Sequence, residues 1–267
     1  MPGEPLQLGV ALPPLSALAD LSAEEIQREG GSRAYRYLLA SNGSEYYCKG
    51  PSLTPGHPYL GANEWVAAGL ARRLAIPVRE LAVIEWDGSL LVGVELLPNA
   101  RKMTGPLNAA TWQRLSNAPA VAYDVAVLDG WTLNTDRHEQ NWLGVVLGPD
   151  RGLFMVNDHD LALMGINRPP AELAQLAQTP LVPEFFRTAV IRDAIIDAHA
   201  LEAAVARAQA VEDQLLANLV GQVPGAWLSD GEKEHVLRFL RDRRDHLGDL
   251  FEHGHNLFPN LGPIDEG

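Results

Sequence analysis

Three side chains with oxygen atoms suited to a metal ion lie close together in the middle of the sequence. Asp136 and Asn141 are five positions apart in the polar run 134–141, and Asp158 follows the next apolar segment. Phosphoryl transfer requires a carboxylate near the attacking hydroxyl and oxygen ligands that hold Mg²⁺ against the phosphates of ATP. Protein kinases carry an aspartate, an asparagine and a second aspartate in this order, so the spacing indicates phosphoryl-transfer chemistry.

A lysine and a glutamate upstream occur in the order of the pair that orients ATP phosphates in kinases. Lys49 ends a strand-like run, and Glu64 lies 15 positions later in the first turn of a predicted helix. Each signal has an ordinary alternative, because Asp and Asn also form turns and strand-end lysines are often exposed. The four elements in the same order are harder to obtain by chance than any one of them.

The elements that must position these residues change type along the chain. Residues 33–97 are mostly strand-like, with hairpins predicted at 41–43 and 87–88 and an amphipathic helix from 62 to 74 that ends before Pro77. After Pro98 the apolar period becomes 3.6, interrupted by one hairpin around 149–152. Helices are predicted at 108–116, 119–132, 183–199, 200–221 and 229–251.

This pattern predicts an α+β fold with two lobes and a cleft between them. The N-terminal lobe, residues 1–98, would contain a small antiparallel sheet and one helix. The C-terminal lobe, residues 99–267, would be mainly helical and carry the catalytic and metal-binding loops. We place the boundary at Pro98-Asn99, where the periodicity changes.

Three stretches of sequence together resemble the HipA-like kinases. They are residues 62–85 (ANEWVAAGLARRLAIPVRELAVIE), 128–145 (LDGWTLNTDRHEQNWLGV) and 154–163 (FMVNDHDLAL). These bacterial proteins are related to the toxin HipA and more distantly similar to phosphatidylinositol kinases and eukaryotic protein kinases. The chain is shorter than full HipA and resembles the compact, stand-alone branch.

The resemblance implies a role for each of the residues identified above. Asp136 would orient or deprotonate the acceptor hydroxyl. Asn141 and Asp158 would bind Mg²⁺. Lys49 would contact the ATP phosphates, and Glu64 would position Lys49.

It also implies where the nucleotide base would bind. The adenine would form hydrogen bonds with the backbone of the segment that joins the lobes, at Glu95, Leu96 and Leu97. Arg137 and His138, beside the catalytic loop, would bind phosphate or hold the loop in place.

Two departures from the family pattern concern the phosphates and the metal. The sequence has no G-x-G-x-x-G loop, and Gly30, Gly31 and Ser32 are the candidate for backbone contacts above the phosphates. Where the family often has Asp-His-Gly, this chain has Asp-His-Asp, ending at Asp160. That extra carboxylate would either bind a second metal ion or cap the following segment.

The composition narrows the partners and the location. A formal net charge of −13 argues against nucleic acid, because phosphate backbones are repelled by an acidic surface. No apolar stretch is long enough to span a membrane, and the N-terminus lacks the basic region of a signal peptide. The single cysteine, Cys48, fits a reducing compartment and a buried thiol. We therefore expect a cytoplasmic protein.

The preferred hypothesis is an ATP- and Mg²⁺-dependent kinase that acts on serine or threonine in a protein. One alternative is a kinase of the same fold that acts on a lipid or small molecule. The other is a pseudokinase that binds nucleotide or a partner without turnover. Retention of Lys49, Asp136, Asn141 and Asp158 argues against the pseudokinase. The sequence does not identify the acceptor, an antitoxin or the oligomeric state.

Overall fold

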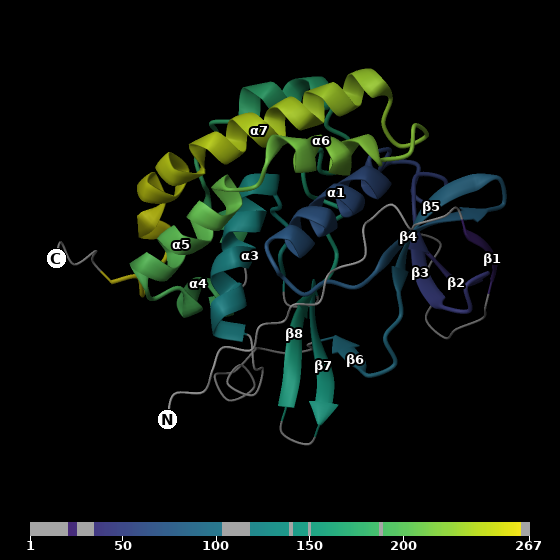
Figure 1. The fold of residues 1–267 in the computed structure, drawn as a ribbon, viewed down its shortest axis with the longest axis horizontal. Helices are drawn as coiled ribbons and strands as arrows, with labels where there is room; N and C mark the ends of the chain where they lie inside the picture. Colours follow the sequence, from purple (N-terminus) through teal and green to yellow (C-terminus); the bar gives the residue numbers. More distant parts are fainter. Residues whose placement is uncertain are drawn as a thin grey trace.

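The computed structural model describes residues 21–25, 35–102, 118–138, 141–148, 151–186 and 189–262. A small barrel of strands occupies one end of the molecule, and helices cover the other end (Figure 1). The barrel consists of β1 (Leu21–Glu25), β2 (Arg36–Ala40), β3 (Glu45–Lys49), β4 (Leu81–Trp86) and β5 (Ser89–Glu95). The predicted α+β arrangement of a sheet lobe and a helical lobe is confirmed.

Both hairpins predicted in the N-terminal lobe are present, and they place β2, β3, β5 and β4 side by side. Gly43 has a φ of +81°, which the tight turn between β2 and β3 requires. In the β4–β5 turn, Asp87 and Gly88 both have positive φ, the geometry of a type I′ hairpin. The sequence did not predict β1, which pairs in parallel with β4 and closes the barrel.

Helix α1 (Leu60–Arg73) is the helix predicted next to the sheet, but its predicted amphipathic character is wrong. Every residue from Leu60 to Arg72 is buried, because β5, α3 and α6 all contact the helix. Close packing explains its small residues: a Cβ on Gly69 would lie 2.3 Å from a methyl carbon of Leu219. The helix also begins earlier than predicted, so Glu64 lies in its second turn.

A second, three-stranded sheet follows the barrel. It consists of β6 (Ala100–Lys102), β7 (Trp142–Gly148) and β8 (Arg151–Val156), in the order β6-β7-β8. The β7–β8 hairpin was predicted, whereas the short β6 was not. This hairpin separates the loop of Asp136 from the loop of Asp158, and its two ends therefore lie together.

The helical lobe is more broken than its periodicity predicted. The helices are α3 (Ala118–Thr132), α4 (Ala189–Ala194), α5 (Ala198–Gln209), α6 (Asp213–Gly221) and α7 (Asp230–His253), with 3₁₀ turns η3 (Pro170–Leu176), η4 (Pro183–Phe186) and η5 (His255–Leu257). The single helices predicted at 183–199 and 200–221 are therefore wrong. Asp197 interrupts the first by capping α5, and Glu212 has extended backbone before α6.

The other predictions for the helical lobe have different outcomes. The helix at 119–132 is α3, and the helix at 229–251 is α7, which starts with a capping box formed by Ser229 and Glu232. The helix predicted at 108–116 lies outside the described residues. The boundary at Pro98-Asn99 stays a prediction. Among the helices of the described ranges, none combines the length and apolar character needed to cross a membrane.

Candidate active site

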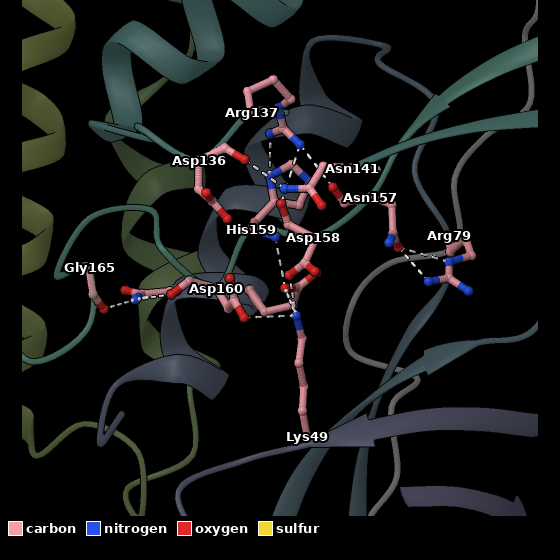
Figure 2. Close-up of polar contacts among 12 residues, drawn as sticks. Lys49, Arg79, Asp136, Arg137, Asn141, Asn157, Asp158, His159, Asp160 and Gly165 are labelled. Atoms are coloured by element: carbon pink, nitrogen blue, oxygen red, sulfur yellow. Dashed lines mark hydrogen bonds and ion pairs between the residues drawn. The ribbon is translucent and has the colours of Figure 1, made fainter. Parts of the chain in front are cut away.

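Lys49 is at the centre of the site, where the barrel meets the helical lobe. Its Nζ lies 2.9 Å from Glu64 Oε2 and 2.5 Å from Asp158 Oδ1. Figure 2 shows the lysine reaching from the barrel to the loop that carries Asp158. Glu64 of the N-terminal lobe and Asp158 of the helical lobe are thus joined through the ammonium group of Lys49.

Glu64 connects the same loop to helix α1. The glutamate is buried, and its Oε2 accepts a hydrogen bond from the backbone N–H of His159 at 2.9 Å. The preceding helix residue, Asn63, donates to the carbonyls of Asp160 (2.6 Å) and Gly165 (3.0 Å). Helix α1 therefore fixes both Lys49 and the backbone of the metal-loop candidate.

The segment 157–160, which we call the DHD loop, leaves β8 with an unusual backbone. Asp158 has a φ of +65°, a left-handed conformation that aspartate tolerates better than most residues. Before the turn, the Val156 N–H donates to the Pro77 carbonyl, and the Asn157 N–H donates to the Asn141 carbonyl. These bonds hold the DHD loop against both lobes.

Asp136 and Asn141 are joined within the second loop. The Asn141 side-chain N–H donates to the Asp136 carbonyl at 2.7 Å, which fixes the amide and directs its Oδ1 elsewhere. The Asp136 side chain is about one-third exposed (32%), so it is accessible to a ligand. His138 Nε2 lies 3.7 Å from Asp136 Oδ2 and pairs with it only when protonated. Figure 2 shows Asp136, Asn141 and Asp158 in one region of the molecule.

Arg137 is buried behind both loops and supports them from the core side. It is fully buried and forms a two-pronged ion pair with Asp129, with N–O distances of 2.9 and 3.0 Å. Its Nη1 donates to the Asn157 carbonyl, and its Nη2 donates to His159 Nδ1 at 3.1 Å. Of the two roles predicted for Arg137, this geometry is that of a residue that holds the loop.

The electrostatic environment keeps Lys49 and Asp158 ionised. Burial would lower the Lys49 pKa, but the surrounding carboxylates outweigh it and hold that pKa well above its usual range. Burial would raise the pKa of Asp158, yet the Lys49 ammonium holds it well below its usual range. Burial raises the pKa of Asp160, 3.6 Å from Lys49, to about 7, and Asp158 adds to the shift.

The segment predicted to receive adenine continues from β5. The N–H groups of Glu95 and Leu96 donate to the carbonyls of Glu80 and Glu45, and the Glu95 carbonyl accepts from Arg79 Nη1 at 3.3 Å. The Leu97 carbonyl accepts from Ala100. Both backbone groups of Glu95 and the Leu96 N–H therefore form hydrogen bonds within the fold. The Leu96 carbonyl and the Leu97 N–H form none of the hydrogen bonds described for this segment.

Sequence reasoning missed residues that act through long-range contacts. Arg79 donates to Asn157 Oδ1 through two nitrogens, Nε at 3.1 Å and Nη2, and so ties the DHD loop to the end of β5 (Figure 2). Asn63 was also missed, although a polar residue beside Glu64 in an alanine-rich helix was a usable signal. The phosphate-loop candidates Gly30, Gly31 and Ser32 lie outside the described residues.

Comparison with solved structures finds the same fold in one kinase and weaker similarity in two further proteins. The Helicobacter pylori proinflammatory kinase CtkA superposes with a TM-score of 0.54 at 15% identity, covering 87% of this chain and 95% of that one. Golgi casein kinase with Mn/ADP bound gives a TM-score of 0.45 at 14% identity, covering 88% and 73%. HipA, in its complex with HipB and operator DNA from Shewanella oneidensis MR-1, gives 0.41 at 12%, covering 96% and 69%.

No curated protein sequence matches the chain. A sequence profile of the HipA-like kinases, in contrast, matches residues 25–249, which is most of the chain. The resemblance found in the sequence motifs is therefore confirmed, and the chain belongs to the HipA-like kinase family.

Proposed function

We propose that this protein is a kinase that binds ATP with Mg²⁺ and transfers the γ-phosphoryl group to a hydroxyl group. The observation that carries the proposal is Lys49, whose Nζ bridges Glu64 of α1 and Asp158 of the DHD loop. Such a bridge presets a cation and a carboxylate on facing sides of one cleft. Phosphoryl transfer depends mainly on positioning of this kind and on charge stabilisation.

Lys49 is the group proposed to bind the ATP phosphates. Its ammonium group lies between the carboxylates of Glu64 and Asp158. When ATP binds, phosphate oxygens would take the place of Asp158 as its partner. Glu64 would keep the ammonium group in position during this exchange, because the His159 N–H fixes Glu64 to the DHD loop. We propose the Leu96 carbonyl and the Leu97 N–H as the backbone groups that pair with adenine.

The donor set fits a Mg²⁺ ion bound together with ATP. Asp158 offers a carboxylate held ionised by Lys49, and Asn141 offers an amide oxygen whose orientation is fixed by its N–H bond to Asp136. The described residues contain no cluster of three or more His, Cys, Asp or Glu arranged for a metal ion. Two protein oxygens are nonetheless sufficient, because Mg²⁺ commonly takes its remaining ligands from water and substrate phosphates. When bound, the ion would neutralise charge that develops on the phosphates.

Asp136 is the residue proposed to act on the acceptor. Its carboxylate is partly exposed and lies in the loop held to Asn141, so an incoming hydroxyl could reach it beside the metal ligands. It would accept a hydrogen bond from the hydroxyl, align it with the γ-phosphate and take up its proton. We propose serine or threonine of a protein as the acceptor, which rests on the family resemblance.

The test is transfer of radiolabelled γ-phosphate from ATP, with and without Mg²⁺, using purified protein and the Asp136→Asn variant. Acceptors would be offered separately as a bacterial protein extract, lipid vesicles and a small-metabolite extract. Mg²⁺-dependent labelling of protein, absent with the variant, is the expected result. Labelling found only on lipid or only on small molecules would show that the acceptor belongs to that class and is not a protein. Nucleotide binding without any transfer would favour the pseudokinase.

A further inference from the structure

Three tyrosine rings lie side by side on the barrel next to Lys49. Tyr35 and Tyr47 have ring centroids 4.6 Å apart, and Tyr37 lies 5.8 Å from Tyr47 and 5.7 Å from Tyr35. Side chains two positions apart on a strand share a face, so Tyr47 points to the same side of β3 as Lys49. Tyr37 lies directly opposite Tyr47 in the β2–β3 register. We call these three rings the tyrosine face.

The tyrosine face continues the surface that faces the helical lobe. In register with Tyr47, β5 contributes Val94, and β4 contributes Leu81 opposite Val94. Both of these aliphatic residues are buried in the same core cluster as helix α1. The three tyrosines lie on the same face of the sheet, at β2 and β3, and remain partly exposed. The sheet face is therefore buried at β4 and β5, where α1 contacts β5, and partly exposed at β2 and β3.

Tyr47 also lies between the two ends of the proposed nucleotide site. Lys49 pairs with Val92, Tyr47 with Val94, and the next residue of β5 is Glu95, where the proposed adenine segment begins. Two residues of strand span about 7 Å, so these rows lie one after another along the face. A nucleotide that extends from Lys49 at its phosphates to Leu96 and Leu97 at its base must pass across Tyr47.

We propose that Tyr47, supported by Tyr35 and Tyr37, is the stacking surface for the base of the bound nucleotide. This inference rests on the proposed function and adds a contact to the base that is separate from the backbone pairing. Any base has a flat π face, so stacking on tyrosine adds affinity without demanding a particular hydrogen-bond pattern. Burial raises the Tyr47 pKa, so the phenol of the proposed stacking ring remains neutral.

The test distinguishes the contribution of the base from that of the phosphates, by comparing the affinities for Mg-ADP and for Mg-pyrophosphate in isothermal titration. Wild type would be compared with Tyr47→Phe, which keeps the ring, and Tyr47→Leu, which removes it. The matched control is Tyr46→Leu, because Tyr46 is the adjacent tyrosine but is buried inside the barrel on the opposite face. Circular dichroism would establish that each variant is folded at the titration temperature.

We expect Tyr47→Leu to weaken Mg-ADP binding about five- to 150-fold and to leave Mg-pyrophosphate binding unchanged. Tyr47→Phe and Tyr46→Leu should bind both ligands as wild type does. Unchanged ADP affinity in Tyr47→Leu, or equal losses for both ligands, would overturn the inference. Wild type that binds pyrophosphate and ADP equally would overturn it too, although the phosphate site would stand. Wild type that binds neither would count against the proposed function itself.

A second measurement covers the case in which Tyr47→Leu does not fold. Nuclear Overhauser contacts would be sought in wild type between the base protons H2 and H8 of ADP and tyrosine ring protons. The assignment is supported if the tyrosine signals that contact the base are retained in Tyr46→Phe and are replaced by phenylalanine ring signals in Tyr47→Phe. Absence of any base-to-tyrosine contact in a saturated complex contradicts it.

Discussion

Two charged networks hold the DHD loop from opposite sides, and they differ in their balance of charge. On the cleft side, the single cation Lys49 faces three carboxylates, those of Glu64, Asp158 and Asp160. On the core side, Arg137 and the Asp129 carboxylate form a one-to-one ion pair. We call these the cleft network and the core network.

The networks also differ in how completely their members are satisfied. The core network is buried, and Asn134 adds a hydrogen bond to Asp129 at 2.9 Å. The cleft network carries more negative than positive charge, and Asp158 is about one-quarter exposed (27%). An excess of carboxylate at an accessible position favours a divalent cation. We therefore propose that the core network stabilises the fold and that the cleft network binds ligands.

Arg137→Ala should produce the largest loss of stability. It leaves the buried Asp129 carboxylate without its cation, and breaking a buried pair in this way costs about 3–5 kcal/mol in the free energy of unfolding. Urea denaturation followed by circular dichroism would measure it. A change below about 1 kcal/mol would show that the core network does not have the structural role assigned to it.

Mg-ADP should stabilise the folded protein through the cleft network. At a free ligand concentration of one hundred times its Kd, the free energy of unfolding should rise by about 2.7 kcal/mol. In Asp158→Ala most of this gain should disappear at the same ligand concentration, because a charged metal ligand has been removed. Differential scanning fluorimetry would follow the shift, with ADP in EDTA as the control. If Mg-ADP raised the melting temperature equally in wild type and in Asp158→Ala, Asp158 would not be a ligand of the metal.

Arg192→Ala should have the smallest effect and so calibrates the comparison. Arg192 also pairs with a carboxylate, that of Asp193 at 3.5 Å, but both side chains are well exposed (41% and 50%). Exposed pairs contribute about 0–1 kcal/mol, so the unfolding midpoint in urea should barely change. A loss of stability as large as that of Arg137→Ala would show that burial does not determine how much an ion pair contributes to the free energy of unfolding.

The sequence predicted the parts of the fold that local signals determine. Turn residues such as Gly43 and Gly88 marked both barrel hairpins, and the apolar period placed the start of α7 within one residue of its position in the structure. The order of Lys49 and Glu64 predicted a pairing across 15 positions, and the two side chains do form an ion pair. These signals are local or belong to a known order, so they can be read without the fold.

Contacts between distant segments could not be predicted in the same way. The Arg79–Asn157 bond joins residues 78 positions apart, and neither residue belongs to a recognisable spacing. The parallel pairing of β1 with β4 depends on the curl of the whole barrel. Helix α1 was predicted to be amphipathic from the spacing of Val66, Leu70 and Leu74, and this local pattern could not show that β5, α3 and α6 together bury every residue from Leu60 to Arg72.

The central claim is that the cleft network and the Asp136 loop perform phosphoryl transfer with divided roles. The most direct test combines isothermal titration of Mg-ATP with a single-turnover assay on Asp136→Ala and Asp158→Ala. Losing a group that acts only in the transition state lowers the chemical rate, whereas losing a ligand to the bound state also weakens binding.

The account predicts that Asp136→Ala binds Mg-ATP nearly as tightly as wild type but transfers phosphate about 10²- to 10⁴-fold more slowly. Asp158→Ala should lose both binding and transfer, and Lys49→Ala should fall between the two. Full activity in Asp136→Ala, or wild-type Mg-ATP affinity in Asp158→Ala, would contradict the assignment of these roles.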